Sequence, residues 1–85
     1  MIETLGVYAM LDTVAATFLT PTFESSEAVA LRNFRFAIES TPFLHSNAAD
    51  YNLYRLANFN PVTGEFESLS PIQLLARGAD FVSKE

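Results

Sequence analysis

An alternating run at Tyr51–Phe59, followed at once by a turn signal, is the strongest indication of local structure in this chain. The run has the period of two that marks a β-strand, with Tyr51, Leu53, Arg55, Ala57 and Phe59 alternating with Asn52, Tyr54, Leu56 and Asn58. Pro61 has the fixed φ that suits the second position of a type I turn, and Gly64 can adopt the left-handed conformation that closes a bulged hairpin. Phe66 then alternates with two glutamates in a returning strand. The sequence therefore predicts a β-hairpin with a positive φ at Gly64.

Residues 26–40 carry the signals of an α-helix. Ser25 and Ser26 are both favourable N-caps, and Glu24 and Glu27 place carboxylates near the positive end of the helix dipole. Three apolar side chains have the spacing of a stripe that faces a core: Leu31, Phe34 and Ile38. Pro42 ends the helix, because the residue before a proline disfavours the α conformation.

The same helix has apolar side chains on nearly the opposite side. Val29 and Phe36 are seven residues apart and are flanked by Arg32 and Asn33. Such a surface is covered either by the C-terminal segment of the same chain or by another subunit. A symmetric self-contact would stabilise a small domain with apolar surface to spare, so we expect a homo-oligomer with Val29 and Phe36 at its interface.

Two further strands are expected before the helix, at Leu5–Leu11 and Thr17–Thr20, the second of them ended by Pro21. Phe43–Asp50 is expected to be irregular.

The C-terminal part of the chain predicts a short second helix. A serine–proline pair begins it, because serine caps helices and proline suits their first turn; the helix covers residues 70–77, with Gly78 at its C′ position. Residues 79–85 form a frayed tail, unless Phe81 packs against the domain.

Together these elements predict a single α+β domain over residues 1–85. It consists of a small antiparallel sheet of three to four strands with one main helix (26–40) packed on a face and a short C-terminal helix. The side chains expected to be buried together are Leu31, Phe34, Ile38, Leu53 or Leu56, Phe59 and Val7.

The composition narrows the function classes. The 85 residues include no cysteine and one histidine, so we expect no metal site and no cofactor. Five basic residues against ten acidic ones give a net charge of −5, which excludes a histone-like DNA binder. The apolar stretch Leu5–Leu19 is interrupted by Asp12, is shorter than a membrane span and follows no basic residue. We therefore expect an unprocessed intracellular protein without a membrane segment.

No pattern in the chain indicates catalysis. His45 lies in the segment expected to be irregular, no strained glycine turn surrounds any serine, and the three glycines are isolated. Glu65 and Glu67 share one side of a strand, which a solvated strand face explains. We expect no catalytic residue and no enzymatic activity.

The aromatic content is the one unusual feature of the composition, with eight phenylalanines and three tyrosines. Tyr51, Tyr54 and Phe59 on one strand have the chemistry to stack single-stranded bases, but core packing is the better interpretation of Tyr51 and Phe59. The candidate residues for nucleic-acid binding are therefore Arg32, Arg35, Tyr54 and Arg55.

Four blocks of sequence resemble a known family. They are Pro21-Thr22-Phe23-Glu24-Ser25, Ala28-Val29-Ala30-Leu31-Arg32-Asn33-Phe34, Asp50-Tyr51-Asn52-Leu53-Tyr54 and Phe59-Asn60-Pro61-Val62-Thr63-Gly64. In order and spacing the chain is similar, over about residues 6–68, to the small nonstructural protein of gokushovirus-type microviruses, the phage ORF5 family. It departs from the family's usual turns at Ala57, Asn60 and Ala48-Ala49.

The resemblance implies a viral product made in the cytoplasm of an infected bacterium and absent from the virion. It implies a role in the switch from duplex replication to synthesis and packaging of single-stranded DNA, and possible binding of that DNA. The alternative is an adaptor that contacts the replication initiator, the procapsid or a host factor without meeting DNA. Clustering of Arg32, Arg35 and Arg55 on one surface would favour DNA binding, and dispersed arginines beside an apolar patch would favour the adaptor.

Overall fold

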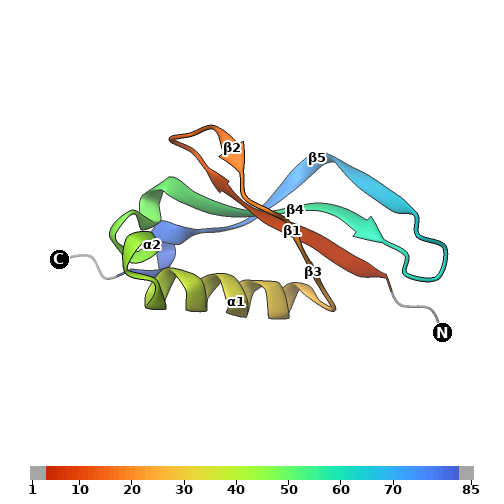
Figure 1. Cartoon of the computed structure of the whole chain (residues 1–85), viewed down its shortest axis with the longest axis horizontal. Coiled ribbons are helices and arrows are strands. Elements are labelled where there is room, and N and C mark those ends of the chain that lie inside the picture. The colour runs from red at the N-terminus through yellow and green to blue at the C-terminus, as the bar shows by residue number, and fades with distance from the viewer. Residues whose placement is uncertain (1–3, 83–85) are drawn as a thin grey trace.

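The computed structural model describes residues 4–82, which form a five-stranded antiparallel sheet with a long helix along one side (Figure 1). The strands are β1 (Leu5–Asp12), β2 (Thr17–Phe18), β3 (Thr22–Glu24), β4 (Tyr51–Phe59) and β5 (Phe66–Arg77). Their order is β2-β1-β4-β5, and β3 also pairs with β1. The helices are α1 (Glu27–Ser40), α2 (Pro42–Ser46) and the 3-10 helices η1 (Ala48–Asp50) and η2 (Gly78–Phe81). The α+β class is confirmed, with more strands than the three to four expected.

The main helix forms where its local signals place it. The Ser26 hydroxyl accepts a hydrogen bond from the backbone N–H of Val29 at 3.2 Å, and α1 then continues to Ser40. No helix among residues 4–82 is both long enough and apolar enough to cross a membrane.

The predicted hairpin between β4 and β5 is confirmed. The side-chain oxygen of Asn60 accepts hydrogen bonds from the backbone N–H groups of Val62 and Thr63, at 2.9 and 3.3 Å. Gly64 has a φ of 80°, and its N–H donates to the Asn60 carbonyl at 2.7 Å. A side chain at this position would be strained, which is why glycine closes the turn.

The predicted short helix over residues 70–77 is wrong, because β5 continues as a strand through this segment. Its backbone pairs with β4 on both sides of an irregular stretch, at Ala57–Ser68 and at Arg55–Gln73. Pro71 lies within that stretch, where its missing N–H removes no ladder hydrogen bond. The local signal for a helix is outweighed by pairing with a strand that is distant in the sequence.

The sequence predicts a frayed tail unless Phe81 packs against the domain, and residues 79–82 meet this exception. Phe81 packs edge-on against Phe34, with 5.9 Å between the ring centroids, and joins the margin of the core. Gly78 allows this return, because a Cβ there would lie 2.9 Å from the Tyr51 carbonyl oxygen and closer still to that of Ala48. Residues 83–85 lie outside the described part of the chain.

The expectation of irregular structure at Phe43–Asp50 is also wrong, because this segment contains α2 and η1. Pro42 ends α1 and occupies the first turn of α2, where its missing N–H costs nothing. The Asp50 carbonyl then accepts the backbone N–H of Thr13 at 2.9 Å, which ties η1 to the turn after β1.

The main core lies between α1 and the sheet. Its largest buried side chains are Phe34 and Ile38 from α1, Tyr8 from β1, and Tyr51 and Leu53 from β4. The predicted burial of Phe34, Ile38 and Leu53 is confirmed.

A β-bulge at Leu56 redirects the second half of β4. Arg55 pairs with Tyr8 and Ala57 pairs with Val7, so Leu56 has no partner in β1. An extra residue in a strand moves every later side chain to the other face, because the side-chain period is two.

Part of the predicted core is wrong, and the bulge explains this for Phe59. Val7 is buried, but outside the cluster that packs against α1. Phe59 belongs to the same face as Val7 and is only half-buried. Leu31 is also half-buried, at the margin of the core under α1.

Candidate interaction surfaces

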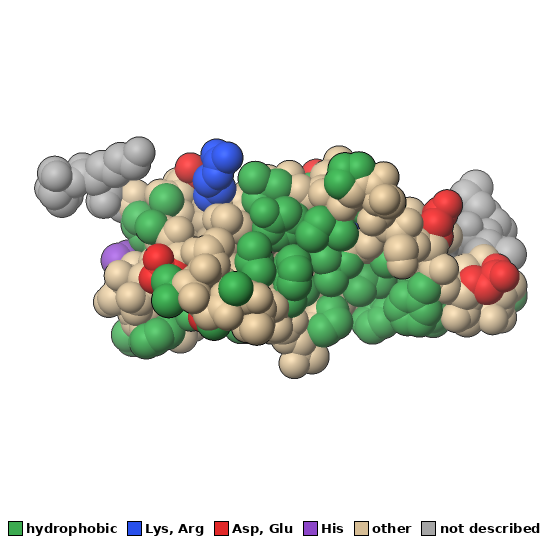
Figure 2. Space-filling model, turned by 90° about the horizontal axis from the view of Figure 1, so that it is seen from above, with side chains coloured by type: hydrophobic (Ala, Val, Ile, Leu, Met, Phe, Trp, Pro, Cys, Tyr) green, Lys and Arg blue, Asp and Glu red, His purple; other side chains and the backbone are tan. Residues whose placement is uncertain are grey.

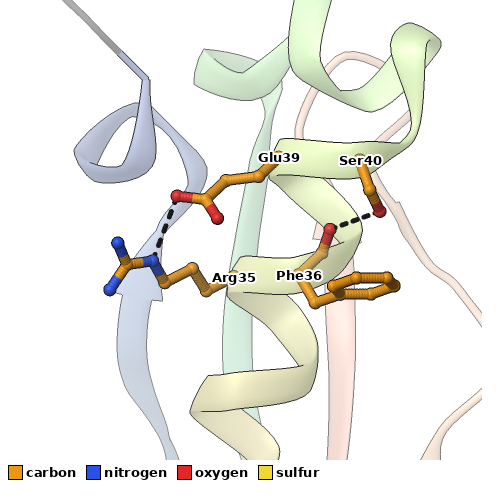
Figure 3. Close-up of polar contacts among 4 residues, drawn as sticks. All are labelled: Arg35, Phe36, Glu39 and Ser40. Atoms are coloured by element: carbon orange, nitrogen blue, oxygen red, sulfur yellow. Dashed lines mark hydrogen bonds and ion pairs between the residues drawn. The ribbon is translucent and has the colours of Figure 1, made fainter.

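Two of the four candidate nucleic-acid residues lie on the outer surface of α1. Arg32 and Arg35 are both exposed. The Arg35 Nε lies 3.0 Å from Glu39 Oε2, an ion pair across one helical turn (Figure 3). The Arg35 guanidinium also lies 5.9 Å from the centre of the Phe81 ring. The carboxylate of Glu39 therefore offsets much of the positive charge of Arg35 on this surface.

Arg55 lies on the α1 side of the sheet and is half-buried. Its guanidinium stands over the ring of Tyr8, at 5.8 Å from the centroid, and donates a hydrogen bond to the side-chain oxygen of Asn58. Its Nε is buried and has no hydrogen-bond partner among residues 4–82. Arg55 is thus packed as part of the structure, where a DNA phosphate has little access to it.

Tyr54 lies on the opposite side of the sheet from Arg55, as neighbouring residues of a strand must. Its ring meets Phe18 edge-on, with centroids 5.7 Å apart. The four candidates are therefore distributed over three surfaces: the outside of α1, the α1 side of the sheet, and the far side of the sheet.

The far side of the sheet, away from α1, is a continuous apolar surface that we term the open sheet face (Figure 2). Cross-strand pairs place its residues, because partners in a ladder share a face. Its large side chains are Phe18, Phe23, Tyr54, Phe59, Phe66 and Leu74, over smaller buried residues that include Val7, Ala9 and Ala57.

Three phenylalanines from three strands form a cluster on the open sheet face. The ring centroids of Phe23 and Phe59 are 5.2 Å apart, those of Phe59 and Phe66 are 4.9 Å apart, and those of Phe23 and Phe66 are 6.0 Å apart. Phe23 remains 46% exposed and Phe66 59% exposed. The rings thus pack against one another while presenting much of their surface to solvent.

None of the acidic residues described by the structure belongs to the open sheet face. Glu24, Asp12 and Glu67 pair with Gly6, Tyr51 and Asn58, which face the α1 side. The other described carboxylates lie in helices or in the turn after β4: Glu27, Glu39, Asp50, Glu65 and Asp80. Figure 2 shows acidic side chains around the margin of the apolar surface.

The predicted interface residues on α1 have different environments. Phe36 is 69% exposed, and in Figure 3 its ring points away from the Arg35–Glu39 pair. Val29 is half-buried. The described part of the chain leaves Phe36 exposed, so this ring is available for contact with another molecule.

A pocket of about 640 Å³ opens between α1 and β1, where the loop between β2 and β3 crosses the edge of the sheet. Its lining is mostly apolar and includes Met10, Leu19 and Phe34. Asn33 donates a hydrogen bond to Glu24 Oε2 at 3.4 Å at its polar rim.

One titratable group near the end of the core, the Tyr51 hydroxyl, has a clearly shifted pKa. Burial and the neighbouring carboxylate of Asp12 raise the pKa of Tyr51, with a smaller contribution from Asp50. The Tyr51 hydroxyl donates to Asp12 Oδ2 at 3.4 Å, and this bond favours the neutral phenol.

His45 lies exposed on α2 and lines neither the pocket beside β1 nor a smaller one near the β4–β5 turn. Residues 4–82 bring together no group of three or more histidine and acidic side chains with the arrangement of a metal site.

Comparison with known protein families identifies the family of the chain. The family model described as Phage ORF5 protein matches residues 5–81. The chain belongs to the Phage ORF5 protein family. No curated protein and no solved structure matches it.

Membership extends over nearly the whole described domain, further than the four sequence blocks that resemble the family, and it makes the chain a bacteriophage protein. The sequence interpretation missed the open sheet face as a surface. A signal for it exists: Phe23 lies between Thr22 and Glu24, and Phe66 between two glutamates, so each strand has one apolar side. That signal becomes informative only once β5 is recognised as a strand.

Proposed function

We propose that this chain is a non-enzymatic bacteriophage accessory protein that acts in viral genome replication and packaging, through contacts with other proteins in the host cytoplasm. Membership of the Phage ORF5 protein family supports the viral origin. The resemblance to the nonstructural protein of gokushovirus-type microviruses supports a role in the switch to single-stranded DNA synthesis and an absence from the virion.

The dispersion of the arginines is the observation that favours protein contacts over DNA. Arg32 and Arg35 lie on the outer surface of α1. Arg55 is half-buried on the side of the sheet that faces α1, and Arg77 pairs with Asn52 at one end of the sheet. Binding to a DNA backbone depends on several cations that reach neighbouring phosphates together. An acidic chain whose four described arginines are divided among three surfaces lacks that arrangement, whereas its apolar surfaces suit protein partners.

Stacking of single-stranded DNA on the open sheet face is a second candidate. Exposed aromatic rings on a sheet are a platform on which bases stack with little regard to sequence. Tyr54 and Phe18 meet edge-on there, and Phe23 and Phe66 are about half exposed. The weakness of this candidate is electrostatic, since the chain carries a net charge of −5.

Infection of the host by phage with an early stop codon in this gene tests the proposed role. We expect duplex viral DNA to accumulate while single-stranded genomes decrease, and expression of the wild-type chain from a plasmid should restore them. An unchanged ratio of duplex to single-stranded viral DNA would contradict a role in the switch.

A titration of labelled single-stranded and duplex oligonucleotides separates the two modes of action. Fluorescence anisotropy at low and physiological salt should show no saturable binding by the purified chain if proteins are its partners. Binding of single strands that survives salt and is lost in Tyr54→Ala, but not in Arg32→Ala, would instead establish stacking on the open sheet face.

A further inference from the structure

Within residues 4–82, no element covers the open sheet face as α1 covers the other side of the sheet. Phe34 under α1 is 4% exposed, whereas Phe66 on the open sheet face is 59% exposed. Sheets whose one face is packed usually present a polar second face to water. From this contrast we propose that two copies of the chain pair through their open sheet faces, as a homodimer of two sheets packed face to face.

The distribution of charge favours a second copy as the occupant. Each copy carries a net charge of −5, so contact between two copies is opposed wherever carboxylates approach one another. The open sheet face has none of the acidic residues described between positions 4 and 82. The only charged residue that the strand ladder assigns to it among those positions is Arg77, opposite Asn52 at one end of β4. This face is therefore where two acidic copies can meet with least repulsion.

The outline of the molecule sets an upper limit on the area that a dimer could bury on this side. The principal extents of the molecule are 47, 24 and 17 Å, and Figure 2 views the face with the longest and shortest of them in the plane. The rectangle of these two extents is on the order of the ~800 Å² that each partner contributes to a standard interface, so a dimer of standard size would use most of this side.

The chemistry of the face suits packing between sheets. The inner faces of a β-sandwich interlock through alternating apolar side chains about 10 Å apart. The Phe23–Phe59–Phe66 cluster and the Phe18–Tyr54 pair would supply the large side chains, and the buried Ala57 lies in the ladder between them. A partner would bury the exposed halves of these rings, each of which adds favourable burial of apolar surface.

The alternative self-contact through α1 offers less apolar surface. Phe36 is exposed, but Val29 is half-buried, and the residue next to Phe36, Arg35, is in an ion pair with Glu39. A contact around Phe36 that extended over this ion pair would have to desolvate it, which costs free energy. Phe36 therefore serves as a control residue of comparable exposure to Phe66.

Sedimentation velocity and light scattering of the purified full chain, from low to high micromolar concentration, test the proposal. We expect wild type to reach twice the 9.4 kDa mass of one chain. Phe66→Glu and Leu74→Glu, at separate places on the open sheet face, should each shift the protein to monomer, while Phe36→Glu should leave the dimer intact. Circular dichroism and thermal melting at low concentration establish that each variant is folded.

Three results would overturn the proposal. They are a wild type that stays monomeric at high micromolar concentration, a dimer that is lost in Phe36→Glu, and a dimer that survives in both face variants. If one face variant does not fold, the other carries the test, because Leu74 and Phe66 pair with different positions of β4. The outcome is independent of the replication role, which the ratio of viral DNA forms measures separately.

Discussion

The two faces of the sheet are both apolar, yet they differ in how their aromatic rings are held. On the α1 side, Phe34 extends from the helix into the core, where strand residues surround it and Phe81 packs edge-on against it. On the open sheet face, Phe66 packs against Phe23 and Phe59 and otherwise meets solvent. The same type of side chain, phenylalanine, thus stabilises the fold on one face and presents a contact surface on the other.

This contrast shows why hydrophobic content alone does not identify a core. Burial requires a covering element, and the described residues form one long helix for a sheet with two apolar faces. A face that stays exposed and apolar gains stability only when another molecule covers it. The face under α1 should therefore determine whether the chain folds, and the open sheet face should determine what it binds.

Replacing Phe34 with alanine should give the largest loss of stability. Removal of this buried ring leaves a cavity and costs ~3–5 kcal/mol of unfolding free energy, enough to unfold a domain this small. Phe66→Ala, the same substitution on the open sheet face, should cost about 1 kcal/mol or less when measured below the concentration of dimer formation. Urea unfolding of both variants makes the comparison, and equal losses would contradict the division of roles between the faces.

Part of this arrangement was predictable because its signals are local. Ser26 caps a helix whose apolar stripe lies within a few turns, and the turn from Asn60 to Gly64 specifies its own backbone. The helix and the hairpin depend on neighbours in the sequence, so sequence alone places them.

The rest was decided by contacts between distant segments. Ser70 and Pro71 have the local sequence signal of a helix start, although they lie in a strand. Pairing of this segment with β4 selects the strand. The bulge at Leu56 leaves no mark on an alternating pattern in which both sets contain apolar residues, yet it changes the face of Phe59. Contacts between distant segments also decide on which surface each arginine lies, so the sequence alone does not predict that the arginines are divided among several surfaces.

Alanine at Gly78 should destabilise the covered side more than alanine at Gly64 destabilises the hairpin. A Cβ at Gly78 would collide with the backbone oxygens of Ala48 and Tyr51, so η1 and η2 would have to separate. We expect a cost at the upper end of the ~1–3 kcal/mol typical of overpacking. Gly64 has open space around it and only a left-handed backbone to maintain, worth about 1–2 kcal/mol. Thermal melting of both variants ranks them, and the opposite order would place the tight backbone contact elsewhere.

The covered side should also respond to alkaline pH through Tyr51. Burial and Asp12 raise its pKa in the folded chain, while the unfolded chain loses the same proton near pH ~10. Above that pH the unfolded state binds fewer protons than the folded state, so stability falls as pH rises towards the folded pKa. Tyr51→Phe should reduce this fall in urea midpoints measured at neutral pH and above pH ~10. Tyr54→Phe, on the open sheet face, is the matched control and should retain it.

The smallest effect is expected outside both faces, on the exposed surface of α1. Arg35 and Glu39 form the one ion pair found among residues 4–82, with side chains that are 63% and 45% exposed. Water and salt screen such a pair, so a double-mutant cycle with Arg35→Ala and Glu39→Ala should give a coupling energy of about 0.3–0.5 kcal/mol. The coupling should decrease further in high salt. A coupling of several kcal/mol would mean that the outside of α1 contributes to folding as the covered face does, and the division of the molecule into a covered core and open surfaces would fail.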